Sequence, residues 1–212
     1  MGYSELERLI EVMATLRQRC PWDAEQTHHS LAQYLIEETA ETIEAIESGN
    51  VGHLREELGD LLLQVIFHAE IASEREDGFT IEDVAGGIAD KLIARHPYVF
   101  TAEKAPSDLH FSWEQRKAVE KGRTSVLEGI PDQLSAVARA NKIISRARSA
   151  RIAVELPAED IDFDDLGTSM LALVARGQAQ GIDPDQALRQ AVRELEGSVL
   201  AAEATGNGRV AG

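Results

Sequence analysis

The stretch LIEETAETIEAIESGNVGHLREELGDLLLQVIF, residues 35–67, contains two helical patterns separated by Gly49 and Asn50. In the first pattern, leucine, isoleucine and alanine fall on one arc of a helical wheel and the glutamates fall on the opposite arc. After residue 60 the second pattern leaves almost no polar face, which predicts a buried helix. Glycine and asparagine are typical of helix ends, so the stretch predicts a helical hairpin.

Two pairs of carboxylates lie on this hairpin. Glu38 and Glu41 are three residues apart, and Glu57 and Asp60 repeat that spacing one helix later. Residues three apart share a helical face, so antiparallel helices would direct all four carboxylates to a common point. Their repulsion is tolerable only if cations lie between them. Oxygen ligands of this kind suit Mg²⁺, with Mn²⁺ as a substitute.

The competing interpretation is a solvated acidic surface, because glutamate is a good helix former and often faces water. Asp60 favours the metal site. It is followed by three leucines, and an ionised carboxylate among apolar side chains is costly unless a metal or a cation compensates it.

Several segments match the motifs of one known family. Residues 37–41 read E-E-x-x-E, and after fifteen intervening residues 57–60 read E-x-x-D. This signature resembles that of the MazG-type nucleoside triphosphate pyrophosphohydrolases, and so do residues 20–27, 90–100 and 111–117. The resemblance covers about residues 18–125. It implies an all-α, four-helix-type fold and Mg²⁺-dependent hydrolysis of NTPs and dNTPs to the monophosphate and pyrophosphate, in a nucleotide-pool cleansing role. It also implies a homodimer, in which a second copy completes the substrate pocket.

The same resemblance assigns roles to residues of this sequence. The metal ligands would be Glu38, Glu41, Glu57 and Asp60, and the substrate-binding residues would be Lys91, Arg95, Trp113 and Lys117. Glu38 and Glu41 are the candidates for activating water, and the choice between them stays open. Lys91 and Arg95 would act in catalysis by neutralising phosphate charge.

The spacing of these basic residues is consistent with those roles. Lys91 and Arg95 are four residues apart and share a helical face, as do Trp113 and Lys117. An aromatic ring one turn from an ammonium group can hold a base and a phosphate. Without the resemblance, solvated basic residues and a core tryptophan would explain the same spacing.

Composition limits the classes of partner. The net charge is −16, from 37 acidic and 21 basic residues, which argues against binding nucleic-acid polymers or anionic membranes. One cysteine excludes an intramolecular disulfide, and no apolar run approaches the length of a membrane span. A cytoplasmic location is expected.

Periodicity and breaker residues predict helices throughout and no strands. The expected helices span about residues 4–18, 28–48, 53–75, 80–95, 112–122, 133–150, 164–180 and 184–204. We expect two domains, a catalytic one over 1–125 and a degenerate, non-catalytic one over 126–212 with a disordered tail from residue 205. In the second domain Thr168 replaces a ligand carboxylate, and Glu194 and Ser198 replace the basic pair.

Three alternatives remain at this stage. A ferritin-like di-iron protein requires two E-x-x-H repeats in its bundle, but only Glu25 to His28 has that spacing, in a predicted loop. A non-catalytic helical adaptor would place the acidic pairs on the surface and bind a partner through the Ala-rich half. A hydrolase narrow for dUTP or dCTP would differ only in its contacts with the base.

Overall fold

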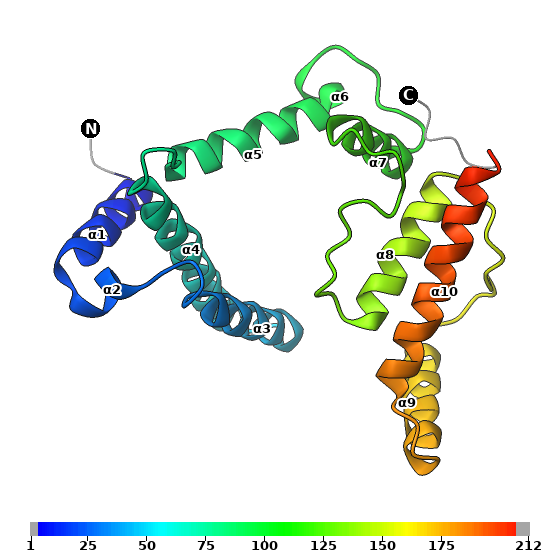
Figure 1. The fold of residues 1–212 in the computed structure, drawn as a ribbon. Coiled ribbons are helices and arrows are strands. Elements are labelled where there is room, and N and C mark those ends of the chain that lie inside the picture. Colours follow the sequence, from blue (N-terminus) through cyan, green and yellow to red (C-terminus); the bar gives the residue numbers. More distant parts are fainter. Residues whose placement is uncertain (1–3, 207–212) are drawn as a thin grey trace. The chain divides into compact units, whose positions relative to one another are not determined.

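The computed structural model describes residues 4–206, except for the side chain at position 110, and all regular secondary structure in this part of the chain is helical. This confirms the all-α fold (Figure 1). The helices are α1 (Glu5–Arg19), α2 (Pro21–Glu25), α3 (Ala32–Ser48), α4 (Val51–Ser73), α5 (Ile81–Arg95), α6 (Pro97–Phe100), α7 (Leu109–Glu120), α8 (Ala136–Ser149), α9 (Phe163–Ala179) and α10 (Pro184–Ala204).

The chain divides into two compact units, residues 1–94 and 95–212. The boundary that the sequence predicts between a catalytic and a degenerate domain, after residue 125, concerns function and stays a prediction. The expected disordered tail lies outside the described residues from 207 onward. None of the helices in the described part of the chain combines the length and the apolarity that a membrane span requires.

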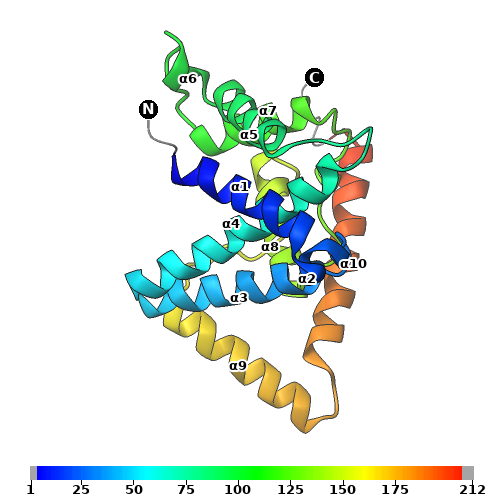
Figure 2. The ribbon, with the colours of Figure 1, turned by 90° about the vertical axis from the view of Figure 1, so that its left-hand side faces the viewer.

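In the first unit, α3 and α4 form the helical hairpin that the sequence predicts, and Figure 2 shows them side by side. Gly49 ends α3 with a φ of 68°, a left-handed conformation that glycine adopts without a steric penalty. Asn50 then caps α4, because its side-chain oxygen accepts hydrogen bonds from the backbone N–H groups of Gly52 and His53. These two adjacent caps fix the tight turn that brings the two acidic segments together.

The core of the first unit lies between α1, the start of α3 and the second half of α4. Its buried members are Met13, Leu31, Ile66, Phe67 and Ile71. Trp22 meets both Tyr34 and Phe67 edge to face. The core therefore holds the C-terminal half of α4 and leaves its N-terminal half free to carry functional side chains.

The second unit has its own core, formed by the segment after α7 together with α8 and α10. Its buried members are Val126, Ile130, Ile143, Ala147, Ile152, Val192 and Val199. Arg146 fastens the segment to α8, because its Nη1 donates hydrogen bonds to the carbonyl oxygens of Val126 and Glu128, at 2.9 and 2.7 Å. α7 packs on α8 within this unit.

Two sequence-based expectations need correction. Glu25 was expected to lie in a loop, but residues 21–25 form α2, a short helix that begins at Pro21, where the missing N–H is not needed. The prediction that α4 is buried all round is also wrong in part. Val65 is 43% exposed in the single chain, because α4 packs against α3 and α1 on only part of its circumference.

Candidate active site

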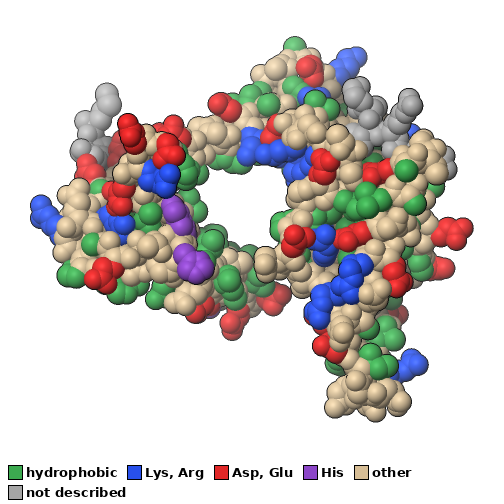
Figure 3. All heavy atoms as spheres, in the orientation of Figure 1, with side chains coloured by type: hydrophobic (Ala, Val, Ile, Leu, Met, Phe, Trp, Pro, Cys, Tyr) green, Lys and Arg blue, Asp and Glu red, His purple; other side chains and the backbone are tan. Residues whose placement is uncertain are grey.

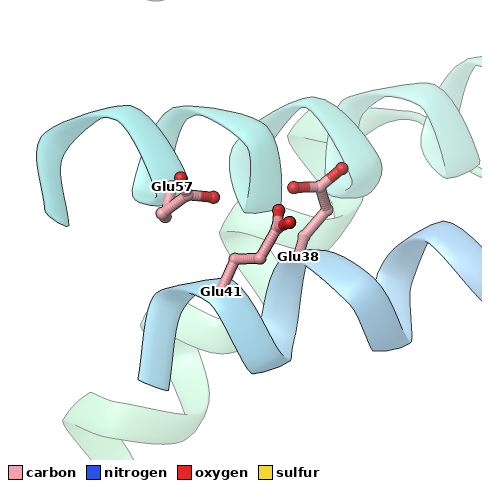
Figure 4. Close-up of side chains that lie close together, drawn as sticks. All are labelled: Glu38, Glu41 and Glu57. Carbon is pink, nitrogen blue, oxygen red and sulfur yellow. The ribbon is translucent and has the colours of Figure 1, made fainter. Parts of the chain in front are cut away.

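Three carboxylates converge between the two helices of the hairpin. Glu38 and Glu41 project from α3 and Glu57 from α4, and Figure 4 shows all three in the space between the helices. One oxygen atom from each lies within 4.8 Å of the others. The hairpin therefore brings together residues from both acidic segments, in an arrangement that could hold a metal ion.

Asp60 adds negative charge beside the same three carboxylates. The pKa of Glu38 is raised, first by burial and then by the negative charge of Asp60, followed by Glu41, Glu57 and Glu37. Asp60 is half-buried on α4 and lies outside the tight group of three oxygens. All four predicted ligands thus contribute negative charge to one small volume, and a bound cation would relieve their repulsion.

Glu57 is the most enclosed of these carboxylates, with only 6% of the residue exposed. One oxygen, Oε1, lies 2.9 Å from Nε2 of His53, one helical turn earlier. The other oxygen, Oε2, is buried and has no hydrogen-bond partner among the described residues. Buried carboxylate oxygens almost always have a partner, so this free oxygen fits the coordination of a hard cation.

The predicted basic residues lie at the end of α5 and on α7. Lys91, half-buried, belongs to the first unit, and Arg95 belongs to the second. Arg95 donates two hydrogen bonds to the carboxylate of Glu120, at 2.8 and 3.0 Å, and its side chain is only 10% exposed. Its guanidinium group is therefore held in a fixed position.

Trp113 lies between two cations in the second unit. The guanidinium carbon of Arg95 is 5.5 Å from its ring centroid, and the ammonium nitrogen of Lys117 is 4.6 Å from it. Burial lowers the pKa of Lys117; the charge of Glu114 raises it, and Lys142, Arg123 and Arg146 lower it further. The structure thus brings three of the predicted substrate-binding residues together.

The predicted residues therefore form two groups, one in each unit. The four carboxylates lie in the first unit, while Arg95, Trp113 and Lys117 lie in the second. The sequence reasoning missed His53, whose pairing with Glu57 has a simple signal, since the two residues are four apart in one helix. It also missed the basic residues around Lys117, because those come from separate segments.

These features define a class of protein, an all-α protein whose helical hairpin carries a carboxylate cluster that could hold a metal ion. A family model described as the MazG nucleotide pyrophosphohydrolase domain matches residues 26–100. The chain is 39% identical, over 214 residues, to the nucleoside triphosphate pyrophosphohydrolase/pyrophosphatase MazG of Thermotoga maritima, covering 89% of this chain and 82% of that protein. It therefore belongs to the MazG family of nucleotide pyrophosphohydrolases, and the predicted enzyme class is confirmed.

Two further relatives show how much of the chain is shared. An uncharacterized 26.1 kDa protein of Streptomyces cacaoi is 47% identical over 92% of this chain and 81% of its own length. The nucleoside triphosphate pyrophosphohydrolase of Mycobacterium tuberculosis is 46% identical over 160 residues, which are 73% of this chain. The match spans 49% of that protein, so the chain covers about half of it.

Proposed function

We propose that this chain hydrolyses nucleoside triphosphates, both NTPs and dNTPs, to the monophosphate and pyrophosphate, with Mg²⁺ as the metal and Mn²⁺ as a substitute. The observation that carries the proposal is the convergence of carboxylates at the α3–α4 hairpin, with the buried and unpartnered Oε2 of Glu57 among them. Glu38, Glu41, Glu57 and Asp60 would hold the metal.

The carboxylates and the basic residues would have different roles in the reaction. Water attacks the α-phosphorus, the bond from that phosphorus to the bridging oxygen breaks, and pyrophosphate leaves with the bonding electrons. Glu38 or Glu41 accepts the proton of the attacking water. Bound Mg²⁺ would supply Lewis acidity and offset the charge of the four carboxylates.

The predicted substrate-binding residues would contact the substrate and the leaving group. Lys91 and Arg95 neutralise negative charge that develops on the transferring and leaving phosphoryl groups, the main electrostatic demand of phosphoryl transfer. The ring of Trp113 would contact the base or ribose, and Lys117 a phosphate. Arg95 suits its role because the two hydrogen bonds to Glu120 orient it before substrate arrives.

A homodimer is part of the proposal. The supporting observation is the apolar side of α3, where Ile36, Ile43 and Ile46 are 71%, 50% and 58% exposed in the single chain. Isoleucine side chains aligned along one helix and open to water favour burial against another protein surface. A second copy pairing there would lie beside the hairpin that carries the carboxylates.

The physiological role that we propose is cleansing of the nucleotide pool in the cytoplasm, with broad base specificity. The overall charge of −16 disfavours nucleic-acid polymers as substrates, whereas local cations still allow free nucleotides to bind.

The test is product analysis with each of the eight common NTPs and dNTPs, with Mg²⁺, with Mn²⁺ and with EDTA. We expect equal amounts of monophosphate and pyrophosphate, released only with metal. Release of diphosphate and inorganic phosphate would contradict the proposed bond cleavage. Turnover of a single nucleotide would retain the reaction but contradict broad specificity, and no turnover would leave the helical adaptor as the better account.

A further inference from the structure

Five polar side chains form a stripe along one face of α4, a helix that is mainly apolar after residue 60. Successive members are three or four residues apart, which places them on the same side of the helix. The members are His53, Glu57, Asp60, Gln64 and His68, and we call them the polar stripe. The stripe includes two of the proposed metal ligands and continues beyond them for two more helical turns.

The polar stripe faces α3 and the turn before it. Figure 4 shows Glu57 directed from α4 into the space between the two helices, where it meets the carboxylates of α3. Further along α4, Nδ1 of His68 lies 2.8 Å from Nδ1 of His28, which belongs to the turn before α3. Gln64 lies between Glu57 and His68 on the same face of α4, so it faces α3 as well.

Gln64 is the buried member of the stripe whose oxygen has no partner. Only 5% of the residue is exposed, whereas Figure 3 shows histidine side chains at the surface of the first unit. Among the described residues, buried side-chain oxygens without a hydrogen-bond partner occur at two positions, Oε1 of Gln64 and Oε2 of Glu57. Both belong to the polar stripe, seven residues apart. The unpartnered oxygens therefore mark the same region of the hairpin as the carboxylates.

A buried amide oxygen without a partner destabilises the folded protein, because it has lost its hydrogen bonds to water. Such oxygens are rare in native proteins and call for a water molecule or an ion as the partner. Helical side chains lean toward the N-terminus of their helix, so the amide of Gln64 leans toward the turn that carries Asp60. The missing partner therefore lies on the side of the proposed metal site.

Distances along the helix determine what kind of contact is possible. Seven residues span about 10 Å along a helix axis, whereas a Mg²⁺–oxygen bond is about 2.1 Å long. An ion bound to Glu57 is therefore too far away for Gln64 to ligate it directly. Asp60 is only one turn from Gln64, and the Cβ atoms of residues with this spacing are about 5–6 Å apart. One metal-bound water molecule can bridge such a gap, and Mg²⁺ usually keeps several of its waters.

We propose that Gln64 is a positioning residue of the metal site, whose Oε1 accepts a hydrogen bond from a water molecule that the metal ion holds beside Asp60. The inference rests on the proposed function for the presence of the metal. It adds a residue that lies outside the E-E-x-x-E and E-x-x-D motifs. It also explains why a buried oxygen lacks a partner within the protein, because that oxygen gains its partner together with the ion.

The test combines calorimetric titration with Mg²⁺ and thermal unfolding in EDTA, both on the full chain. Gln64→Met keeps the length of the side chain and removes the acceptor. It should weaken Mg²⁺ binding by roughly 10- to 100-fold. In EDTA its melting temperature should be unchanged or higher, because a buried oxygen without a partner is gone. Gln33→Met is the matched control, since it makes the same change at an exposed position of α3 and should alter neither quantity.

A second variant, Gln64→Glu, separates the oxygen of the amide from its nitrogen. Glutamate keeps an acceptor of the same length and loses the N–H donors. If the acceptor is what matters, Gln64→Glu should bind Mg²⁺ at least as tightly as the unaltered chain. Circular dichroism checks that the variants are folded.

Weak Mg²⁺ binding in Gln64→Met, combined with tight binding in Gln64→Glu and an unchanged or higher melting temperature of Gln64→Met in EDTA, supports the inference. Equal Mg²⁺ affinity in Gln64→Met and the unaltered chain would overturn it, as would loss of Mg²⁺ binding in Gln64→Glu. A lower melting temperature of Gln64→Met in EDTA would also overturn it, by showing that the amide stabilises the fold without metal. Weaker binding of a non-hydrolysable NTP at unchanged Mg²⁺ affinity would place Gln64 against the substrate instead. None of these measurements uses turnover, so Mg²⁺ binding that depends on Gln64 in a chain without NTP hydrolysis would refute the proposed function and leave this inference standing.

Discussion

His53 lies one helical turn before Glu57 on α4, with its Nε2 atom 2.9 Å from Oε1 of that buried carboxylate. The pairing fixes one oxygen of Glu57 and leaves the other, Oε2, without a hydrogen-bond partner in the described chain. His53 itself is held near the start of α4, where the side chain of Asn50 accepts a hydrogen bond from its backbone N–H. A local cap thus orients a carboxylate that we propose as a metal ligand.

The first prediction concerns this orientation. His53→Ala should weaken Mg²⁺ or Mn²⁺ binding by roughly 10- to 100-fold, the usual effect of removing a group that positions a metal ligand. His53→Gln, which can still donate a hydrogen bond, should recover part of the loss. Metal titration followed by calorimetry measures the effect, with the exposed His29→Ala as control. Equal affinities in all three variants would show that His53 does not position Glu57.

The second prediction concerns the carboxylates themselves. Glu41→Gln and Asp60→Asn should each lower turnover at least about 100-fold while keeping the fold, because each removes a negative charge without changing size. In metal-free buffer both variants should melt at a higher temperature than the unaltered chain, since repulsion with Glu38 is relieved.

Glu44→Gln is the matched control for this pair, because Glu44 is exposed on α3 and lies outside the cluster. It should leave both activity and melting temperature nearly unchanged. Near-normal turnover in Glu41→Gln or Asp60→Asn would remove that residue from the metal site.

The third prediction separates chemistry from nucleotide binding. Lys91→Ala and Arg95→Ala should mainly lower kcat, because negative charge grows on the leaving pyrophosphate, whereas Trp113→Ala should mainly raise KM, by about tenfold. Steady-state kinetics with one NTP measures both constants. Val119→Ala, an exposed change on the same helix as Trp113, is the control. Unchanged constants in the three test variants would contradict the assigned substrate site.

The fourth prediction concerns stability and pH. Arg17 on α1 donates two hydrogen bonds to Glu74 after α4, at 2.5 and 3.0 Å, and this contact lowers the pKa of Glu74 below its ordinary value of 4.5. A lowered folded-state pKa stabilises the fold above the unfolded pKa, and that stabilisation is lost as the pH falls through the folded pKa. Glu74→Gln should therefore destabilise the protein by about 1 kcal/mol at pH 7, a modest amount because Glu74 is half exposed.

Urea unfolding from pH 7 down to pH 3 measures this dependence. The difference between the unaltered chain and Glu74→Gln should shrink steadily below about pH 4.5. Glu76→Gln, exposed and two residues away, should show no such dependence. A difference that stays constant with pH would mean that the charge of Glu74 contributes nothing.

The helical hairpin could be predicted from sequence because its determinants are local. Gly49 and Asn50 act on the backbone within a few residues, so both the end of α3 and the start of α4 lie close to the predicted positions. The spacing of the carboxylates likewise determined which helical face they share. Periodicity shows which residues share a helical face but does not show what covers that face, which is why Val65 was wrongly expected to be buried.

The basic residues around Lys117 could not be predicted in the same way. Lys117 and Lys142 are far apart in the sequence and approach each other only because α7 packs on α8. Arg146 reads in the sequence as one more exposed base on an amphipathic helix, yet it is buried and binds two carbonyl oxygens. Contacts of this kind depend on tertiary packing, which no spacing rule within a single helix contains.

The most direct test of the central claim is hydrolysis of one NTP in ¹⁸O-labelled water, with mass analysis of the products. Attack of water at the α-phosphorus predicts one ¹⁸O atom in the monophosphate and none in the pyrophosphate, in a reaction that requires Mg²⁺ and is lost in Glu41→Gln. Label in the pyrophosphate, or formation of labelled phosphate with a nucleoside diphosphate, would contradict the account.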